Sequence, residues 1–172
     1  MSIINGLNKE LDALGEKGVF ETSVLSNKAS LDTEAAKRIE GQRIIAKYRT
    51  DFPRTIDAFR QRLASSAELT NEQKKGAIAG LEASRQKVSQ QYETMFNLLG
   101  NKEKAEYDFL SFMGGAFNEY QLRDRKISFN STIVRERYHE LAKEIEDTTK
   151  QTAAFSKDWT DKANASLLKL SQ

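Results

Sequence analysis

The chain has 172 residues, of which 38% are hydrophobic and 30% are charged. That much charge excludes a thick globular core and the apolar content excludes a disordered chain, so amphipathic helices with narrow apolar seams fit best. Nine glycines and one proline are too few for the turns of an all-β protein, and a net charge of +2 gives no overall attraction to polyanions.

The first expected element is a short amino-terminal helix within residues 1–30, followed by a connector. Its apolar residues recur every three or four positions: Ile4, Leu7, Leu11 and Leu14. Gly15 and Gly18 are expected to end this helix, because glycine weakens a helix and suits the turn that follows it.

A long helix is predicted over residues 31–66. Ser30 and Asp32 both have side chains that can cap its first turn. Its apolar residues keep helical spacing: Ile45, Tyr48, Phe52, Ile56, Phe59 and Leu63. Pro53 removes one backbone hydrogen bond, but the spacing stays in phase across it, so we predict a kink near Pro53 rather than an end.

The next helix is predicted over residues 71–99. Thr70 and Gln73 match the capping-box pattern, in which each side chain bonds to the other residue's backbone. Apolar residues at helical spacing follow: Ile78, Leu81, Val88, Tyr92, Met95 and Leu99. Gly100 suits the residue after a helix and Asn101 can cap a new one, so a boundary is expected here.

Two further helices are expected, over residues 102–128 and 131–171. Residues 128–132 are rich in cap and turn residues, which favours a break near 129. Tyr120, Ile127 and Val134 are nevertheless seven residues apart, which would allow one continuous helix, so both arrangements remain open. The last helix keeps heptad spacing for about five heptads.

These patterns predict an all-α protein of one domain, residues 1–172. Its architecture is expected to be an antiparallel bundle of three to four long amphipathic helices with a short amino-terminal helix. No period of 20–50 residues repeats, which argues against a solenoid.

The sequence offers little support for catalysis. Glu136 and His139 have the spacing used in di-iron bundles, but His139 is the only histidine and Glu136 lies far from the seam of its helix. The glycines do not match a phosphate-binding loop. We therefore predict no catalytic residue, no metal site, no cofactor and no small-molecule substrate.

The most unusual stretch is residues 107–120, whose apolar side chains cover most of a helical circumference. The simpler interpretation is a packed central helix with a close glycine contact. The functional interpretation is a surface for a protein partner, an apolar ligand or a membrane, with these candidate residues: Phe109, Phe112, Met113, Phe117 and Tyr120.

Two further features concern charge. Arg85 occupies a seam position, so it should pair with a carboxylate, extend to solvent or face a partner. Arg43, Lys47 and Arg54 lie on one strip of the helix 31–66, inside a segment, residues 37–62, with eight basic and three acidic side chains. Such a strip could follow a phosphate backbone, although it could equally pair with the acidic residues 1–36.

Without cysteine, disulfides and thiolate metal sites are excluded. Neither a secretory signal nor a membrane-spanning run is visible, so a cytoplasmic location is the default expectation. The leading functional hypothesis is a non-enzymatic scaffold or adaptor that acts through protein contacts or self-association. Membrane or apolar-ligand binding through residues 107–120 is the first alternative, and nucleic-acid binding through the basic strip is the second.

Overall fold

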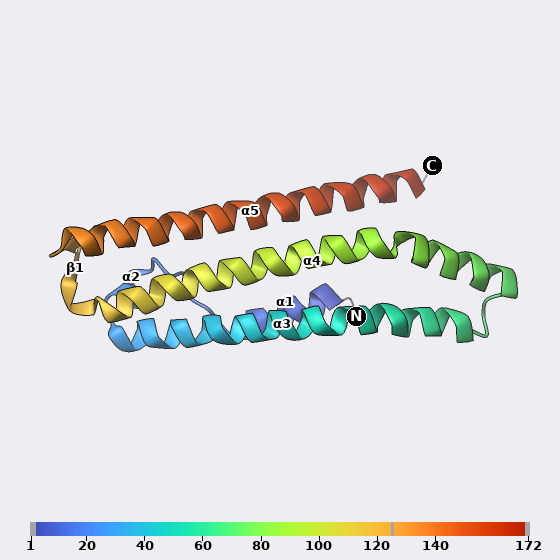
Figure 1. Ribbon diagram of the computed structural model, residues 1–172, viewed down its shortest axis with the longest axis horizontal. Helices are drawn as coiled ribbons and strands as arrows, with labels where there is room; N and C mark the ends of the chain where they lie inside the picture. The colour runs from blue at the N-terminus through green and yellow to red at the C-terminus, as the bar shows by residue number, and fades with distance from the viewer. Residues whose placement is uncertain (1–2, 125, 171–172) are drawn as a thin grey trace.

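The computed structural model describes residues 3–124 and 126–170. Three long helices alternate in direction along the bundle, α3 (Lys28–Ser65), α4 (Asn71–Gly115) and α5 (Thr132–Leu170), so that α4 runs antiparallel to both α3 and α5 (Figure 1). Helix α4 packs against both α3 and α5. The predicted all-α antiparallel bundle is therefore confirmed, and it contains three long helices.

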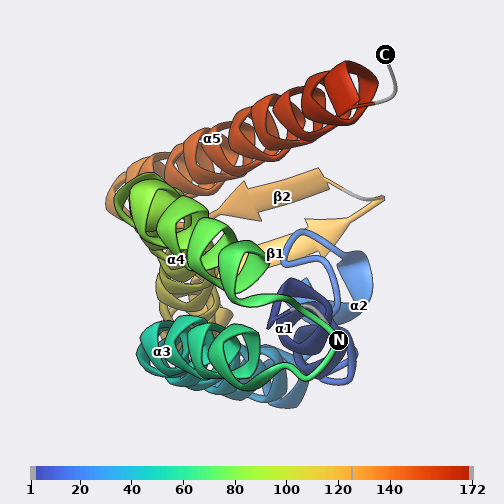
Figure 2. The same ribbon diagram turned by 90° about the vertical axis from the view of Figure 1, so that its right-hand side faces the viewer.

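The remaining elements lie on one side of this helical layer (Figure 2). They are two short helices, α1 (Ile3–Asp12) and α2 (Thr22–Leu25), and a two-stranded hairpin. Both short helices pack on α3. Gly15 follows α1 with a φ of 56°, a left-handed conformation that glycine adopts without strain. The short amino-terminal helix is thus confirmed.

Helix α3 begins earlier than predicted. The side chain of Asn27 accepts hydrogen bonds from the backbone N–H groups of Ala29 and Ser30, and so caps the helix. Asn27 is as good a capping residue as Ser30 or Asp32, which is why the sequence pattern placed the start a few residues late. The helix continues through Pro53 without interruption.

Helix α4 begins as predicted, with a complete capping box between Thr70 and Gln73. The predicted boundary between helices 71–99 and 102–128 is wrong, because α4 runs through Gly100 and Asn101 to Gly115. Buried residues on both sides of this point, among them Phe96 and Ala105, pack into the bundle. That packing outweighs the weak helix propensity of a single glycine.

The second half of the predicted helix 102–128 is also wrong. After Gly115 the chain forms a short 3-10 helix, η1 (Phe117–Glu119), and then antiparallel strands β1 (Tyr120–Arg123) and β2 (Lys126–Phe129). Tyr120 pairs with Phe129 and Leu122 with Ile127. These four side chains all pack into or against the core, an alternation typical of half-buried strands. The hairpin therefore separates α4 from α5.

Helix α5 begins at Thr132, one residue after the predicted start, and the predicted last residue, 171, lies outside the described part of the chain. Two buried apolar clusters hold the bundle together. One lies beside the β-hairpin, which defines the sheet end of the bundle, and includes Phe109 and Leu141. The other lies under α1 and includes Leu7, Phe52 and Phe96. The opposite end, at the α3–α4 loop, is called the loop end.

Candidate interaction surfaces

The loop-end hairpin, residues 54–92 of α3 and α4, has an apolar stripe but no buried residue. Its large apolar side chains are half-buried or exposed: Ile56, Phe59, Leu63, Leu69, Ile78, Leu81, Val88 and Tyr92. Phe59 is 51% exposed. Two helices alone cover only part of each other's apolar stripe, and a third element is needed to cover the rest.

Ion pairs between the two helices fix how the loop-end hairpin is aligned. Arg85 of α4 lies 3.0 Å from Asp57 of α3, and Arg60 of α3 lies 3.0 Å from Glu82 of α4. Arg85 thus pairs with a carboxylate, as one of the sequence interpretations required. These pairs are partly exposed, so they specify alignment more than they add stability.

Trp159 joins α5 to the middle of the bundle. Its ring stands at 85° to that of Tyr92 on α4, with 5.2 Å between the ring centres, and Phe155 lies one turn away on α5. Beside these rings is a pocket of about 200 Å³ between α1, α4 and α5, lined mainly by apolar residues that include Ile4 and Leu99. The aromatic heptad positions of α5 therefore serve internal packing here.

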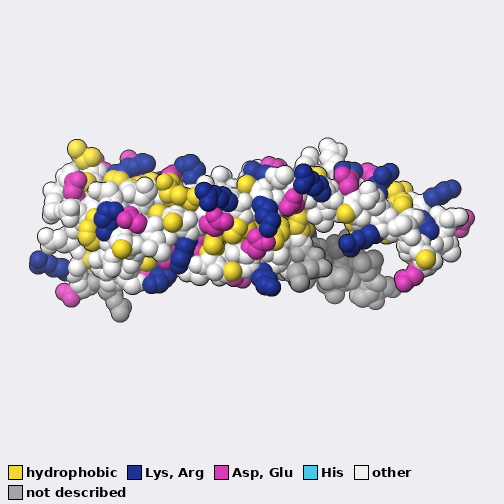
Figure 3. Space-filling model, turned by 90° about the horizontal axis from the view of Figure 1, so that it is seen from below, with side chains coloured by type: hydrophobic (Ala, Val, Ile, Leu, Met, Phe, Trp, Pro, Cys, Tyr) yellow, Lys and Arg dark blue, Asp and Glu magenta, His cyan; other side chains and the backbone are white. Residues whose placement is uncertain are grey.

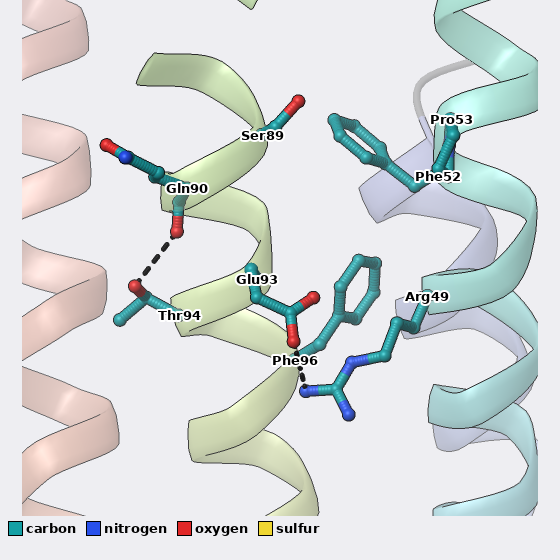
Figure 4. A pocket seen from close by; sticks show the side chains of 8 residues that line it. All are labelled: Arg49, Phe52, Pro53, Ser89, Gln90, Glu93, Thr94 and Phe96. Atoms are coloured by element: carbon teal, nitrogen blue, oxygen red, sulfur yellow. Dashed lines mark hydrogen bonds and ion pairs between the residues drawn. The ribbon is translucent and has the colours of Figure 1, made fainter. Parts of the chain in front are cut away.

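A larger groove of about 700 Å³ lies between α3 and α4 beside Pro53 (Figure 4). Phe52 and Phe96 line it, and Arg49 reaches toward α4, where its guanidinium lies 3.1 Å from the carboxylate of Glu93. Pro53 has no N–H, so it cannot bond to the carbonyl of Arg49 one turn earlier. The groove is open to solvent and is bridged by this ion pair. We therefore interpret it as a feature of the packing between α3 and α4.

The segment 107–120 does not form an exposed surface. Phe109 and Met113 are fully buried and Tyr120 is 6% exposed, while Phe112 and Phe117 pack against the same core. The hydroxyl of Tyr120 donates a hydrogen bond of 2.6 Å to the carbonyl of Leu25, and burial raises the pKa of Tyr120 to about 12. The packed-core interpretation therefore fits this segment, and its candidate residues do not form an accessible surface in the closed bundle.

The three residues of the predicted basic strip are each compensated by a carboxylate. Arg43 pairs with Glu40 at 3.1 Å, and Arg54 lies 3.5 Å from Asp51. Lys47 lies 2.9 Å from Glu10 of α1, so the acidic amino-terminal segment does pair with the strip at this point. Figure 3 likewise shows basic and acidic side chains interspersed over the face it presents.

At the sheet end, charged residues are buried between α3, α4 and the amino-terminal segment. Arg38 of α3 is 2% exposed. Its Nη1 lies 2.5 Å from Oε2 of Glu16 and its Nε 2.6 Å from Oε2 of Glu106, at ion-pair distances without the alignment of hydrogen bonds. Its Nη2 donates a 2.7 Å hydrogen bond to the carbonyl of Lys17. One guanidinium therefore joins three parts of the chain.

A second carboxylate of α4, Glu103, completes this cluster. It is 6% exposed, and its Oε2 has no hydrogen-bond partner among the described residues. Burial, followed by the negative charge of Glu16, raises the pKa of Glu103 to about 7, although Lys102 and Arg38 oppose the rise. The sequence pattern gives no sign of this cluster, because its members come from segments far apart in the chain.

No metal centre is formed by the parts of the chain described. Among residues 3–124 and 126–162, no three His, Cys, Asp or Glu side chains are grouped so that they could hold a metal ion. Glu136 and His139 are both exposed on α5. Within the same residues, no helix is long and apolar enough to cross a membrane.

Comparison with known proteins adds no relative: no family model, no curated protein and no solved structure matches the chain.

Proposed function

We propose that the chain is a non-enzymatic helical adaptor whose loop-end hairpin binds an amphipathic helix of another protein. The observation that carries this proposal is the part of the stripe that packs against neither core cluster and yet contains no buried residue: Phe59, Leu63, Leu69, Ile78 and Leu81. A helix laid along the stripe would cover it as a third or fourth helix covers a bundle.

The edge of the stripe on α4 favours close approach of such a helix. Ala77 and Ser84 are seven residues apart, so they lie along one side of α4, and neither carries a charge. Small residues let two helices approach closely, and the absence of charge lowers the cost of removing water. One heptad further, Gln91 lines a pocket together with Phe155 and Trp159, so there the same side of α4 faces α5.

The charges of the hairpin indicate the chemistry of the partner. Residues 54–88 carry seven basic and four acidic side chains. Arg60 and Arg85 pair within the hairpin. Arg62, Lys74 and Lys87 have no ion-pair partner within the described residues. A helix with acidic side chains beside its apolar face would complement them, whereas a second positively charged hairpin would be repelled.

The available area indicates a weak, reversible complex. Two helices about 10 Å apart present a face roughly 20 Å wide. Helix α3 contributes only residues 54–65 to the hairpin, a length of ~18 Å, which gives ~360 Å² on each partner. The total of ~720 Å² is below that of stable interfaces, as expected for an adaptor that binds its partner transiently.

The proposal is tested with a photo-crosslinking amino acid at Leu81, expressed in the native cell, with the same group at exposed Glu136 as a control. We expect a crosslinked protein from Leu81 only. The product should disappear with Phe59→Ser and persist with Ile133→Ser, because both side chains are exposed, at 51% and 79%, and only Phe59 belongs to the hairpin.

Three other outcomes of this crosslinking experiment would contradict the proposal in whole or in part. No crosslink from Leu81 above the Glu136 control would overturn the adaptor function. A crosslink to a second copy of the chain would replace the acidic partner helix with self-association. A foreign partner that still binds when Arg62 and Lys87 are both changed to Glu would contradict the argument from charge.

The two alternatives have weaker support. Binding of a membrane or an apolar ligand through residues 107–120 would require the sheet-end core to open, because Phe109 and Met113 are fully buried. Nucleic-acid binding through Arg43, Lys47 and Arg54 would require each to leave its carboxylate partner.

A further inference from the structure

The segment that follows α1 is fastened to α3 by polar contacts. The ammonium group of Lys37 donates a 2.7 Å hydrogen bond to the carbonyl of Gly15. The backbone N–H of Lys17 donates to the carboxylate of Glu34 at 2.9 Å. Arg38 holds both Glu16 and the carbonyl of Lys17. Residues 15–17 are therefore held mainly by interactions with charged groups. The strength of these interactions depends on the other charges nearby.

Glu103 faces these contacts from α4. Its carboxylate lies against the backbone of Gly41, and a methyl group there would stand 2.7 Å from its Oε2. The absence of a side chain at Gly41 gives the carboxyl group its space. The side chain thus sits at a close approach of α3 and α4, where little water reaches it.

Four charged groups act on Glu103. Glu16 faces it from the amino-terminal segment, Arg38 from α3, and Lys102 and Glu106 from its own helix. Arg38 already pairs with Glu16 and Glu106, and Lys102 lies 3.0 Å from Glu106. An ionised Glu103 would therefore be the third carboxylate beside one buried guanidinium.

We propose that Glu103 is a proton-controlled latch: protonated, it allows residues 15–17 to stay fastened to α3, and ionised, it loosens them. The repulsion between Glu16 and Glu103 is mutual. If the charge of Glu16 opposes ionisation of Glu103, ionised Glu103 must weaken the docking of Glu16 by the same free energy. Movement of the segment relieves the repulsion, since Glu16 is the carboxylate that is not on α4.

The direction of the change follows from the charge states. The pKa of Glu103 in the folded chain is about 7, above the ordinary value of 4.5. The segment should thus be fastened in mildly acidic solution and loosened as the pH rises through neutrality. This inference does not depend on the proposed adaptor function.

The chain has no cysteine, so a single spin label can be placed on it. Ala13 is exposed in the turn between α1 and the fastened segment, which makes Ala13→Cys a suitable site. We expect an immobile spectrum at low pH and a mobile one at high pH, with a midpoint near 7. A label at exposed Gln151 of α5 is the control and should not change.

Two variants make the test decisive. Glu103→Gln cannot ionise, so the label at Ala13 should stay immobile at every pH. Glu16→Gln removes the charge that ionised Glu103 repels, so the change to a mobile spectrum should be lost or much reduced. A wild-type spectrum that does not change with pH would overturn the latch, as would a transition that persists in Glu103→Gln. If Glu103→Gln fails to fold, a full transition in Glu16→Gln overturns it instead.

Discussion

Gly41 of α3 and Glu103 of α4 lie so close that a Cβ atom at Gly41 would be 2.7 Å from Oε2 of Glu103. Most glycines in long helices only weaken them, but this one makes room for a buried carboxyl group. The contact links helix packing to ionisation, because any shift of either helix changes the surroundings of Glu103.

Gly41→Ala should destabilise the chain by about 1–3 kcal/mol, because the added methyl group displaces a buried polar group. Gly80→Ala is the matched control, since no atom lies within 4 Å of the position of its added Cβ. It should stabilise α4 by about 0.5–1 kcal/mol through helix propensity. Urea unfolding followed by circular dichroism measures both, and equal effects would contradict the contact at Gly41.

Arg38→Met should be far more damaging than Arg43→Met. Arg38 is 3% exposed in its side chain, and its loss leaves Glu16 and Glu106 without their main cation, at a cost of about 3–5 kcal/mol. Arg43 is 73% exposed in its side chain, and its ion pair with Glu40 contributes less than about 1 kcal/mol. A small loss of stability on Arg38→Met would show that the buried cluster is not required for folding.

Stability should depend on pH through Glu103. The pKa of Glu103 is raised in the folded chain, so its contribution is full below 4.5 and is lost as the pH rises to about 7. The free energy of unfolding of the wild type, relative to Glu103→Gln, should therefore fall over this interval by as much as about 1.4 kcal/mol per pH unit. Parallel curves for the two proteins would exclude a raised pKa.

Trp159→Ala should loosen the second half of α5 while leaving the first half in place. Trp159 contacts Tyr92, whereas Leu141 and Ile145 anchor the first half in the sheet-end core. The local free energy of opening near residue 159 should fall by about 1–3 kcal/mol. Hydrogen exchange of α5 peptides measures it, and unchanged exchange around residues 150–162 would show that Trp159 does not anchor α5.

The sequence was sufficient for features that rest on local chemistry. The capping box at Thr70 and the continuous stripe across Pro53 both depend on residues within a few positions of one another. The break before Thr132 stayed open, because residues 120, 127 and 134 also fit one continuous helix. The β-hairpin could not be predicted, because Tyr120 and Ile127 fit a helical heptad as well as a strand. Strands of four residues show too little alternation of apolar and polar side chains to distinguish the two.

The candidate sites were harder to predict, because burial depends on tertiary contacts. Phe109 and Phe59 both belong to apolar helical stripes, yet one is fully buried and the other 51% exposed. The difference arises from α2 and the β-hairpin, which lie at the sheet end, and from the first half of α5, which packs there through Leu141 and Ile145 (Figure 1). Likewise, nothing near Arg38 in the sequence shows that Glu16 and Glu106 surround it.

Hydrogen exchange of the isolated, dilute protein tests the central claim most directly, namely that the loop-end hairpin lacks a core of its own. Residues 54–92 contain no buried side chain, while residues 96–114 contain eight buried residues. We predict amide exchange at least about tenfold faster in the first segment after correction for intrinsic rates. Equal protection of both segments in a monomeric sample would contradict the account, because the hairpin would then be complete without a partner.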